Sequence, residues 1–187
     1  MPVQAFFSSL IIVFLTELGD KTMIATILLS AEHRRPYLVL FAAMLALMIS
    51  TFIAVVLGVL LSTALPLDVI VYISGILFVG LGLYTLTKRE DEEDVDADRQ
   101  ITFFSMFSLV LVSELGDKSQ IAVLALAAQS LFPVLVFFGA MIGFFLLNTM
   151  GAISGDKIGN RIPLKLIRIF TGIVFITIGF LIILGFL

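Results

Sequence analysis

The sequence contains no cysteine and only one histidine, His33. The missing thiols exclude disulfides, thiolate metal sites, iron–sulfur clusters and thiol catalysis. A single histidine likewise excludes a zinc site built from several histidines. Charge is also scarce: 13% of the 187 residues are charged, whereas a soluble domain carries about 25%. These absences argue against a soluble enzyme with a buried core.

Long apolar segments make up most of the chain, which is 60% hydrophobic and has a mean hydropathy of +1.20. Six of them are long enough to cross a bilayer: residues 5–30, 37–61, 67–87, 102–128, 131–154 and 163–186. A segment in lipid must satisfy its own backbone hydrogen bonds, so each is expected to be a helix. The sequence therefore predicts an all-α integral membrane protein whose partner is the lipid bilayer, with no nucleic-acid partner.

The positive charges lie on one side of this predicted arrangement. Nine of the 11 lysines and arginines fall in three alternate connections, namely Arg34, Arg35, Lys88, Arg89, Arg99, Lys157, Arg161, Lys165 and Arg168. The connections around residues 62–66 and 129–133 contain none. Because cytoplasmic loops are enriched in lysine and arginine, we expect both termini outside the cytoplasm. The first residues carry no positive charge or evident cleavage site, so no removed signal peptide is expected.

An internal repeat divides the chain. A shift of 97 residues aligns the two halves without a gap, and 27 of the 77 positions from Phe6 to Gly82 are identical. Each half, residues 1–87 and 102–187, has three predicted spans. Because three is odd, the second half enters the membrane in the opposite direction. The prediction is a pair of inverted-topology three-helix repeats, an architecture common in secondary transporters.

An acidic linker, residues 88–101, joins the two repeats on the predicted cytoplasmic side. Seven of the nine positions from Glu90 to Asp98 are acidic. Such a charge run is typical of a solvated connector. A loose antenna for divalent cations, or a regulatory segment, is the alternative interpretation.

The most polar intramembrane stretch is repeated in both halves. Glu17-Leu-Gly-Asp-Lys-Thr22 lies midway along the first span, and Glu114-Leu-Gly-Asp-Lys-Ser119 lies midway along the fourth. Each ionisable group costs about 2.5–3.5 kcal/mol at mid-membrane on insertion scales, so these groups must face a protein interior or a water-filled cavity. The two copies contain six ionisable groups in all, and a role in helix packing alone does not account for so large a cost.

Helical spacing predicts that these side chains converge. On a helix, Glu17 and Asp20 are about 60° apart, and Lys21 is about 40° from Glu17 on the other flank. The second copy has the same geometry, and an inverted repeat brings both faces together. Four carboxylates and two ammonium groups sum to −2, which balances one divalent cation. Gly19 and Gly116 permit close approach or local unwinding.

The predicted ligands are hard oxygen atoms, which suit Ca²⁺, Mn²⁺ or Mg²⁺ rather than Cu⁺ or Zn²⁺. Additional oxygen donors could come from Thr22, Ser119, Gln120, Ser50, Thr51, Asn148 and Thr149, of which Thr51 and Asn148 are repeat equivalents. An alternative interpretation is that Glu17–Lys21 and Glu114–Lys118 are ion pairs that only lock the bundle. That interpretation leaves Asp20 and Asp117 unexplained.

The doubled motif, the six spans and the acidic central linker together resemble uncharacterised protein family 0016, also called the Gdt1 and transmembrane-protein-165 family. The resemblance covers essentially the whole chain. It implies cation binding by Glu17, Asp20, Glu114 and Asp117, with supporting motif positions at Gly19, Lys21, Thr22, Gly116, Lys118 and Ser119. Members are regarded as Mn²⁺ and Ca²⁺ transporters that exchange the cation for protons, and bacterial members with both repeats on one chain resemble Mn²⁺ exporters.

The sequence thus favours a transporter that exports Mn²⁺, with Ca²⁺ as a second cargo, in exchange for protons. Thr51, Asn148 and Gln120 form an expected second ring around the carboxylates. No prosthetic group is expected, and a homo-oligomer is left open. A bacterial plasma membrane is the expected location. A small amino-acid exporter of the lysine-exporter type is the main rival, and an intramembrane enzyme or a scaffold protein fits less well.

Overall fold

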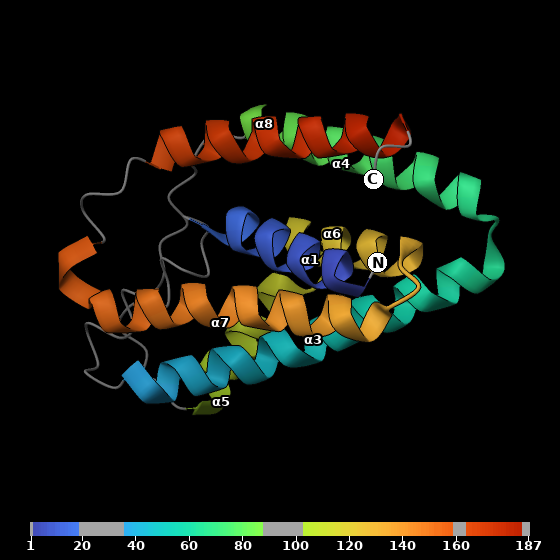
Figure 1. The fold of residues 1–187 in the computed structure, drawn as a ribbon. Helices are drawn as coiled ribbons and strands as arrows, with labels where there is room; N and C mark the ends of the chain where they lie inside the picture. Colours follow the sequence, from blue (N-terminus) through green and yellow to red (C-terminus); the bar gives the residue numbers. More distant parts are fainter. Residues whose placement is uncertain (1, 19–35, 88–102, 159–163, 185–187) are drawn as a thin grey trace.

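All described elements of the protein are helices (Figure 1). The structure is a computed structural model that describes residues 2–18, 36–87, 103–158 and 164–184. Its helices are α1 (Pro2–Glu17), α3 (Pro36–Ala64), α4 (Leu67–Thr87), α5 (Phe103–Glu114), α6 (Lys118–Gln129), α7 (Pro133–Ile158) and α8 (Leu164–Ile183). The all-α prediction is confirmed for these ranges.

Three of the described helical segments are long and apolar enough to cross a membrane, namely Pro36–Ala64, Leu67–Thr87 and Pro133–Gly151. Shorter apolar helical segments are Pro2–Glu17, Phe103–Glu114 and Gly172–Ile183. The helices α3 and α7 begin at Pro36 and Pro133, where the missing proline N–H costs little because the first helical amides have no intrahelical partner. These lengths and compositions agree with a multi-pass membrane protein.

The fourth predicted span, residues 102–128, is not the continuous helix that the sequence predicted. Helix α5 ends at Glu114 and α6 begins at Lys118. Between them, Gly116 has a φ of 84°, in the left-handed region that only glycine adopts at little cost. The amide of Asp117 donates a hydrogen bond of 3.1 Å to the carbonyl of Glu114, which closes the turn. The span is therefore two half-helices joined at the polar motif.

Helix α1 also ends at the motif. Its last residue is Glu17, and the amide of Leu18 donates to the carbonyl of Phe14 at 3.2 Å. The rest of the predicted first span, residues 19–30, lies outside the described residues. Two helices, α1 and α5, thus end at the first glutamate of each motif.

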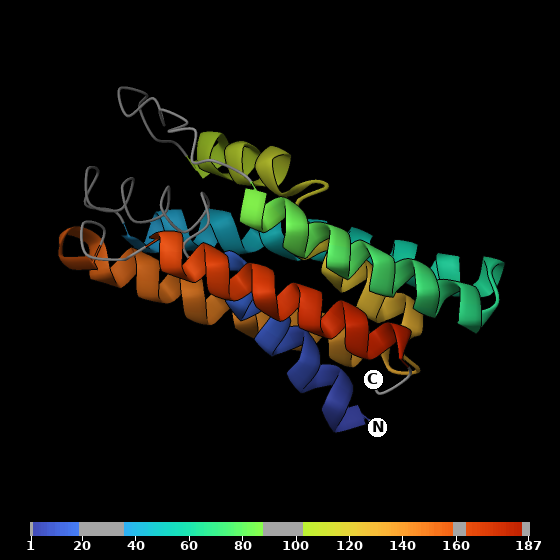
Figure 2. The ribbon, with the colours of Figure 1, turned by 90° about the horizontal axis from the view of Figure 1, so that it is seen from above.

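The helices form two packed groups. Helix α4 lies along α8, whereas α1 lies along α7 and α3 contacts α5, α6 and α7 (Figures 1 and 2). A larger apolar core fills the space between α1, α3, α5, α6 and α7, and includes Val13, Leu47, Val110, Val123 and Phe144. A smaller apolar cluster joins the α4–α8 pair to α1 and α6. Hence α4 and α8 form a unit that contacts the rest of the protein through fewer side chains.

Close backbone approach holds α4 against α8. A Cβ atom added at Gly82 would lie 2.7 Å from the Gly172 carbonyl oxygen, and one at Gly179 would lie 2.7 Å from that of Gly75. Between these crossings, the buried rings of Phe78 and Phe175 have centroids 5.7 Å apart. Small residues allow such close contact between helices. In a membrane, helices associate through packing, because the hydrophobic effect of water is absent there.

The contacts of the two halves follow the 97-residue shift. Gly172, Phe175 and Gly179 are the repeat equivalents of Gly75, Phe78 and Gly82. The shift therefore exchanges the two glycine contacts and maps the phenylalanine pair onto itself. It also converts the packing of α1 on α7 into the packing of α5 on α3.

Candidate functional site

Three carboxylates meet where the broken helices end. Glu17 closes α1, Glu114 closes α5, and Asp117 stands in the turn before α6. One oxygen of each lies within 4.8 Å of the other two. Glu17 and Glu114 are each only 1% exposed, so the cluster lies inside the protein. The fold thus brings together residues from both copies of the motif.

The spacing of these oxygens fits a single bound cation. Calcium binds oxygen ligands at about 2.3–2.6 Å, so two ligands on opposite sides of one ion are about 4.8 Å apart. All three carboxylates could therefore contact one ion without a change in the helices. Carboxylates also match the preference of hard divalent ions over Cu⁺.

Electrostatic repulsion between the three carboxylates makes the binding of positive charge at the cluster favourable. Two carboxylate oxygens at most 4.8 Å apart repel each other by about 3.5 kcal/mol or more at an effective dielectric constant of about 20, if both groups are ionised. Burial removes the water that would otherwise screen them. Lys118 follows Asp117 as the first residue of α6, and the positive end of the α6 dipole also favours a carboxylate at this position. Repulsion among the carboxylates therefore favours the binding of a cation or of protons.

The helix break positions Asp117. Its backbone is extended, with φ −70° and ψ 166°, and its side chain makes no cap hydrogen bond to α6. The carboxylate instead belongs to the cluster with the two glutamates. Broken helices with their ends at the midplane are how many transporters line an ion site. Local backbone chemistry at Gly116 thus gives Asp117 a position that a continuous helix would not.

A buried polar cluster beside the site joins α6 to α3. The Nε2 of Gln120 donates to the Ser50 hydroxyl at 3.0 Å and to the Thr51 hydroxyl at 3.5 Å. The Ser50 hydroxyl in turn donates to the Leu47 carbonyl at 3.1 Å. Two buried oxygens at the end of the motif, Oγ of its last residue Ser119 and Oε1 of Gln120, have no hydrogen-bond partner within the described part of the chain. Buried polar atoms of this kind are uncommon and mark places where an ion or water is accommodated.

Asn148 occupies the corresponding place on α7. It is 1% exposed, and its Nδ2 donates to the Phe144 carbonyl at 2.9 Å. The preceding residue, Leu147, packs against Phe14 and Leu18 at the end of α1. Helix α7 therefore passes the end of α1 close to Glu17, at the depth of Asn148.

The structure places the second copy of the motif completely and the first copy in part. Glu114, Gly116, Asp117, Lys118 and Ser119 are all described. Gly19, Asp20, Lys21 and Thr22 lie outside the described residues. The prediction that the motif side chains share one face of an unbroken helix is wrong for the second copy, because Gly116 interrupts the helix. The signal for the break was the glycine inside the motif.

Comparison with known proteins points to one family. Residues 5–93 and 102–186 match the family model described as "Divalent cation/proton antiporter GDT1". The two matched segments each contain one copy of the motif. The break between them falls in the acidic linker.

Named relatives cover most of the chain. It is 29% identical over 163 residues to the "Putative manganese exporter" of Vibrio cholerae, which is 86% of this chain and 80% of the relative. It is 27% identical to "GDT1-like protein 5" of Arabidopsis thaliana, over 95% of this chain and 94% of the relative. The "Divalent cation/proton antiporter GDT1" of Saccharomyces cerevisiae is 24% identical, over 92% of this chain and 81% of the relative. No solved structure matches the chain significantly.

Proposed function

The chain belongs to the GDT1 family of divalent cation/proton antiporters, and on this premise we propose that it exports Mn²⁺ from the cytoplasm in exchange for protons. As a member, it is a membrane transporter of divalent cations and not an enzyme. The observation that carries the proposal is the convergence of Glu17, Glu114 and Asp117. Two buried carboxylates and a partly buried one, from two halves of the chain, form the kind of site that a divalent ion occupies.

The full cation site in this proposal has four carboxylates. Asp20, the repeat equivalent of Asp117, joins the three that the structure brings together. Lys21 and Lys118 orient the carboxylates when the cation is absent, and Thr22 and Ser119 supply hydroxyl oxygens. Gly19 and Gly116 allow the chain to unwind there. Thr51, Gln120 and Asn148 form a second ring.

Manganese is the proposed main cargo, and calcium is a second one. Carboxylate, hydroxyl and amide oxygens bind both ions, and cavity size and ligand number set the preference. The name of the Vibrio cholerae relative supports manganese. The family match favours a cation over the amino acid of the rival interpretation.

Proton exchange follows from the charge of the site. Carboxylates held this close repel one another once the cation leaves, so protons replace it on the same oxygens. Cation and protons then compete, and an inward proton gradient drives the cation outward. Each ion thus leaves the site most readily on the side where the other is abundant.

The proposed architecture has six membrane spans in two inverted repeats, residues 1–87 and 102–187, joined by the cytoplasmic linker 88–101. Support comes from the contacts that the 97-residue shift exchanges, above all the self-equivalent pair Phe78–Phe175. Inverted repeats that rock against each other give alternate access to one midplane site. In this proposal both termini lie outside the cytoplasm of a bacterium, and the lysine and arginine distribution supports that orientation.

Transport by purified protein in liposomes tests the site. Mn²⁺ uptake driven by a proton gradient should fall at least about tenfold in Glu114→Gln and in Asp117→Asn, because each removes a ligand and a negative charge. The matched control is Asp68→Asn, which neutralises an exposed carboxylate in the first turn of α4. Wild-type flux in both site variants, with the control also unchanged, would reject the site. If the liposomes transported lysine but not Mn²⁺, the result would favour the rival interpretation, a small amino-acid exporter.

A further inference from the structure

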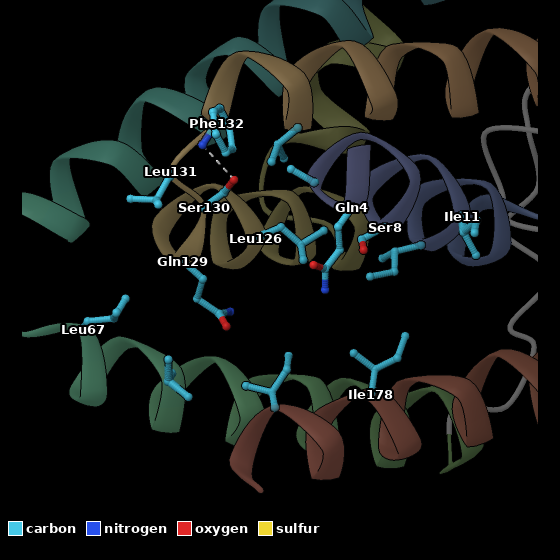
Figure 3. Close-up of a pocket in the computed structure, with 15 residues that line it drawn as sticks. Gln4, Ser8, Ile11, Leu67, Leu126, Gln129, Ser130, Leu131, Phe132 and Ile178 are labelled. Atoms are coloured by element: carbon cyan, nitrogen blue, oxygen red, sulfur yellow. Dashed lines mark hydrogen bonds between the residues drawn. The ribbon is translucent and has the colours of Figure 1, made fainter. Parts of the chain in front are cut away.

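A cavity of about 490 Å³ opens between two walls at the end of the bundle where α1 begins and α8 ends (Figures 1 and 3). One wall, from α1, α6 and the connection to α7, carries the polar side chains Gln4, Ser8, Gln129 and Ser130 among apolar ones such as Leu126. The opposite wall, from α4 and α8, is apolar and is formed by Leu67, Val71, Ile178 and Ile182. The cavity is therefore amphipathic, and the two helices of its polar wall are those that adjoin the carboxylate cluster.

Both polar-wall helices lead from the cavity to the carboxylates. Ser8 lies nine residues before Glu17 on α1, which is about 14 Å along the helix. Gln129 lies twelve residues after Asp117, about 18 Å along α6. Figure 3 shows the amide groups of Gln4 and Gln129 pointing into the cavity. The Gln129 side chain is held there by its Nε2, which donates to the Ala125 carbonyl at 3.1 Å.

An apolar seal lies between the cavity and the carboxylates. The smaller apolar cluster consists of Ile12, Phe78, Ala122, Ala125, Phe175 and Ile182, each at most 5% exposed. Ile12 and Ile182 also line the cavity. Ile12 stands five residues before Glu17, and Ala122 stands five residues after Asp117. Along both helices the order is therefore cavity, apolar cluster and carboxylate.

We propose that the cavity is the aqueous vestibule through which the divalent cation passes between the carboxylate site and the non-cytoplasmic side, and that the cluster is the seal that closes it in this structure. This inference rests on the proposed function. The vestibule lies at the end of the bundle that lacks the basic connections. The side chains that line it carry no charge. A passing hydrated cation meets neutral oxygens that bind weakly enough to release it.

Most of the lining is apolar, but its four polar side chains favour water and ions over a lipid chain as the occupant. A groove for an acyl chain gains nothing from amide and hydroxyl groups, which lose their hydrogen bonds to water when an apolar chain covers them. Here the polar groups are gathered on one wall. The apolar wall belongs to the α4–α8 pair, which is joined internally by its glycine contacts. A shift of this pair relative to α1 and α6 opens the seal.

Cysteine labelling tests the vestibule directly, because the natural chain has no cysteine. Ser8→Cys and Gln129→Cys should react with a membrane-impermeant cationic methanethiosulfonate added from outside, and not from the cytoplasmic side. Two controls are Ala128→Cys, buried beside Gln129, and Ile173→Cys, on the exposed apolar face of α8. The vestibule residues should react at least about tenfold faster than both controls, because thiols react as thiolates in water. Equal rates would overturn the vestibule, as would labelling only by a lipid-soluble maleimide, which would indicate a lipid occupant.

The seal has its own test. Ala122→Cys, at 1% exposure, should react slowly alone and at least about tenfold faster when combined with Phe78→Ala. Phe78→Leu serves as a milder second variant if the alanine form does not fold. Unchanged labelling in a folded variant would overturn the seal.

Labelling does not require transport, so the two proposals fail separately. Intact Mn²⁺ flux with unreactive Ser8→Cys and Gln129→Cys rejects the vestibule and leaves the proposed function in place. Reactive cysteines in a protein that moves no cation show a water-filled cavity, but they reject the proposed function and with it the cavity's role as a cation path.

Discussion

The carboxylates of Glu17 and Glu114 lie within 4.8 Å of each other, although 97 residues separate them in the sequence. They occupy the same position in the two copies of the motif. Two equivalent residues of a pair of repeats come this close only near the axis that relates the repeats. Phe78 and Phe175 are a second such pair. In the inverted repeat proposed above, a site on this axis contacts both halves, so a movement of one half against the other would change access to it.

The first prediction is that the two glutamates act as one unit. Glu17→Gln and Glu114→Gln should each reduce Mn²⁺ flux at least about tenfold, and the double variant should lose little more than either single one. Groups that hold one ion together are strongly non-additive in double-mutant cycles. Flux in proteoliposomes measures this, with Asp68→Asn as the control. Losses that multiply in the double variant would mean that the two glutamates act at separate places.

The second prediction concerns the left-handed glycine of the helix break. Gly116→Ala should destabilise the protein by about 1 kcal/mol or more, since alanine is strained at a φ of 84°. It should also reduce transport, because the turn positions Asp117. Gly80→Ala is the matched control. Among the residues that the structure describes, no packing neighbour lies within 4 Å of a Cβ added at either glycine, but Gly80 has a helical backbone.

Thermal unfolding in detergent measures this stability difference, and flux measures the effect on the site. Gly80→Ala should be neutral or slightly stabilising, since alanine favours a helix. If Gly116→Ala has the same melting temperature and the same Mn²⁺ flux as Gly80→Ala, the break between α5 and α6 does not depend on glycine at position 116.

The third prediction concerns the crossing of α4 and α8. Gly82→Ala should cost about 1–3 kcal/mol, because its Cβ would lie 2.6 Å from a side-chain carbon of Ile176 and 2.7 Å from the Gly172 carbonyl oxygen. Gly80→Ala, two residues away in the same helix, again provides the comparison. A melting temperature that falls for Gly82→Ala alone would show that close approach holds the pair together. Equal melting temperatures would contradict the packing.

The fourth prediction concerns pH. Carboxylates must lose their protons before they bind a cation, so Mn²⁺ affinity should weaken as pH falls, and binding should release protons. Calorimetry in two buffers of different ionisation enthalpy counts these protons. Glu114→Gln should release fewer protons than Asp68→Asn, because it removes a titrating ligand. Affinity that does not change with pH would contradict proton–cation competition.

Some features of the site were beyond sequence reasoning. The polar cavity residues Gln4, Ser8 and Gln129 were not identified from the sequence, because isolated polar residues in apolar helices give no periodic signal. The bond between Gln120 and Ser50 joins residues 70 positions apart. The sequence marked both as polar candidates but could not pair them, since pairing depends on which helices pack together.

The sequence by itself determined that this chain is helical and lies in the membrane, because apolar segments in lipid must satisfy their own backbone hydrogen bonds. It also predicted which residues carry the chemistry, since buried charge is too costly to retain without a use. The tertiary structure decided that Gly116 breaks the fourth span, that Glu17, Glu114 and Asp117 meet, and that Phe78 faces Phe175. These depend on one backbone torsion and on contacts between distant segments, and both are settled only when the whole bundle packs.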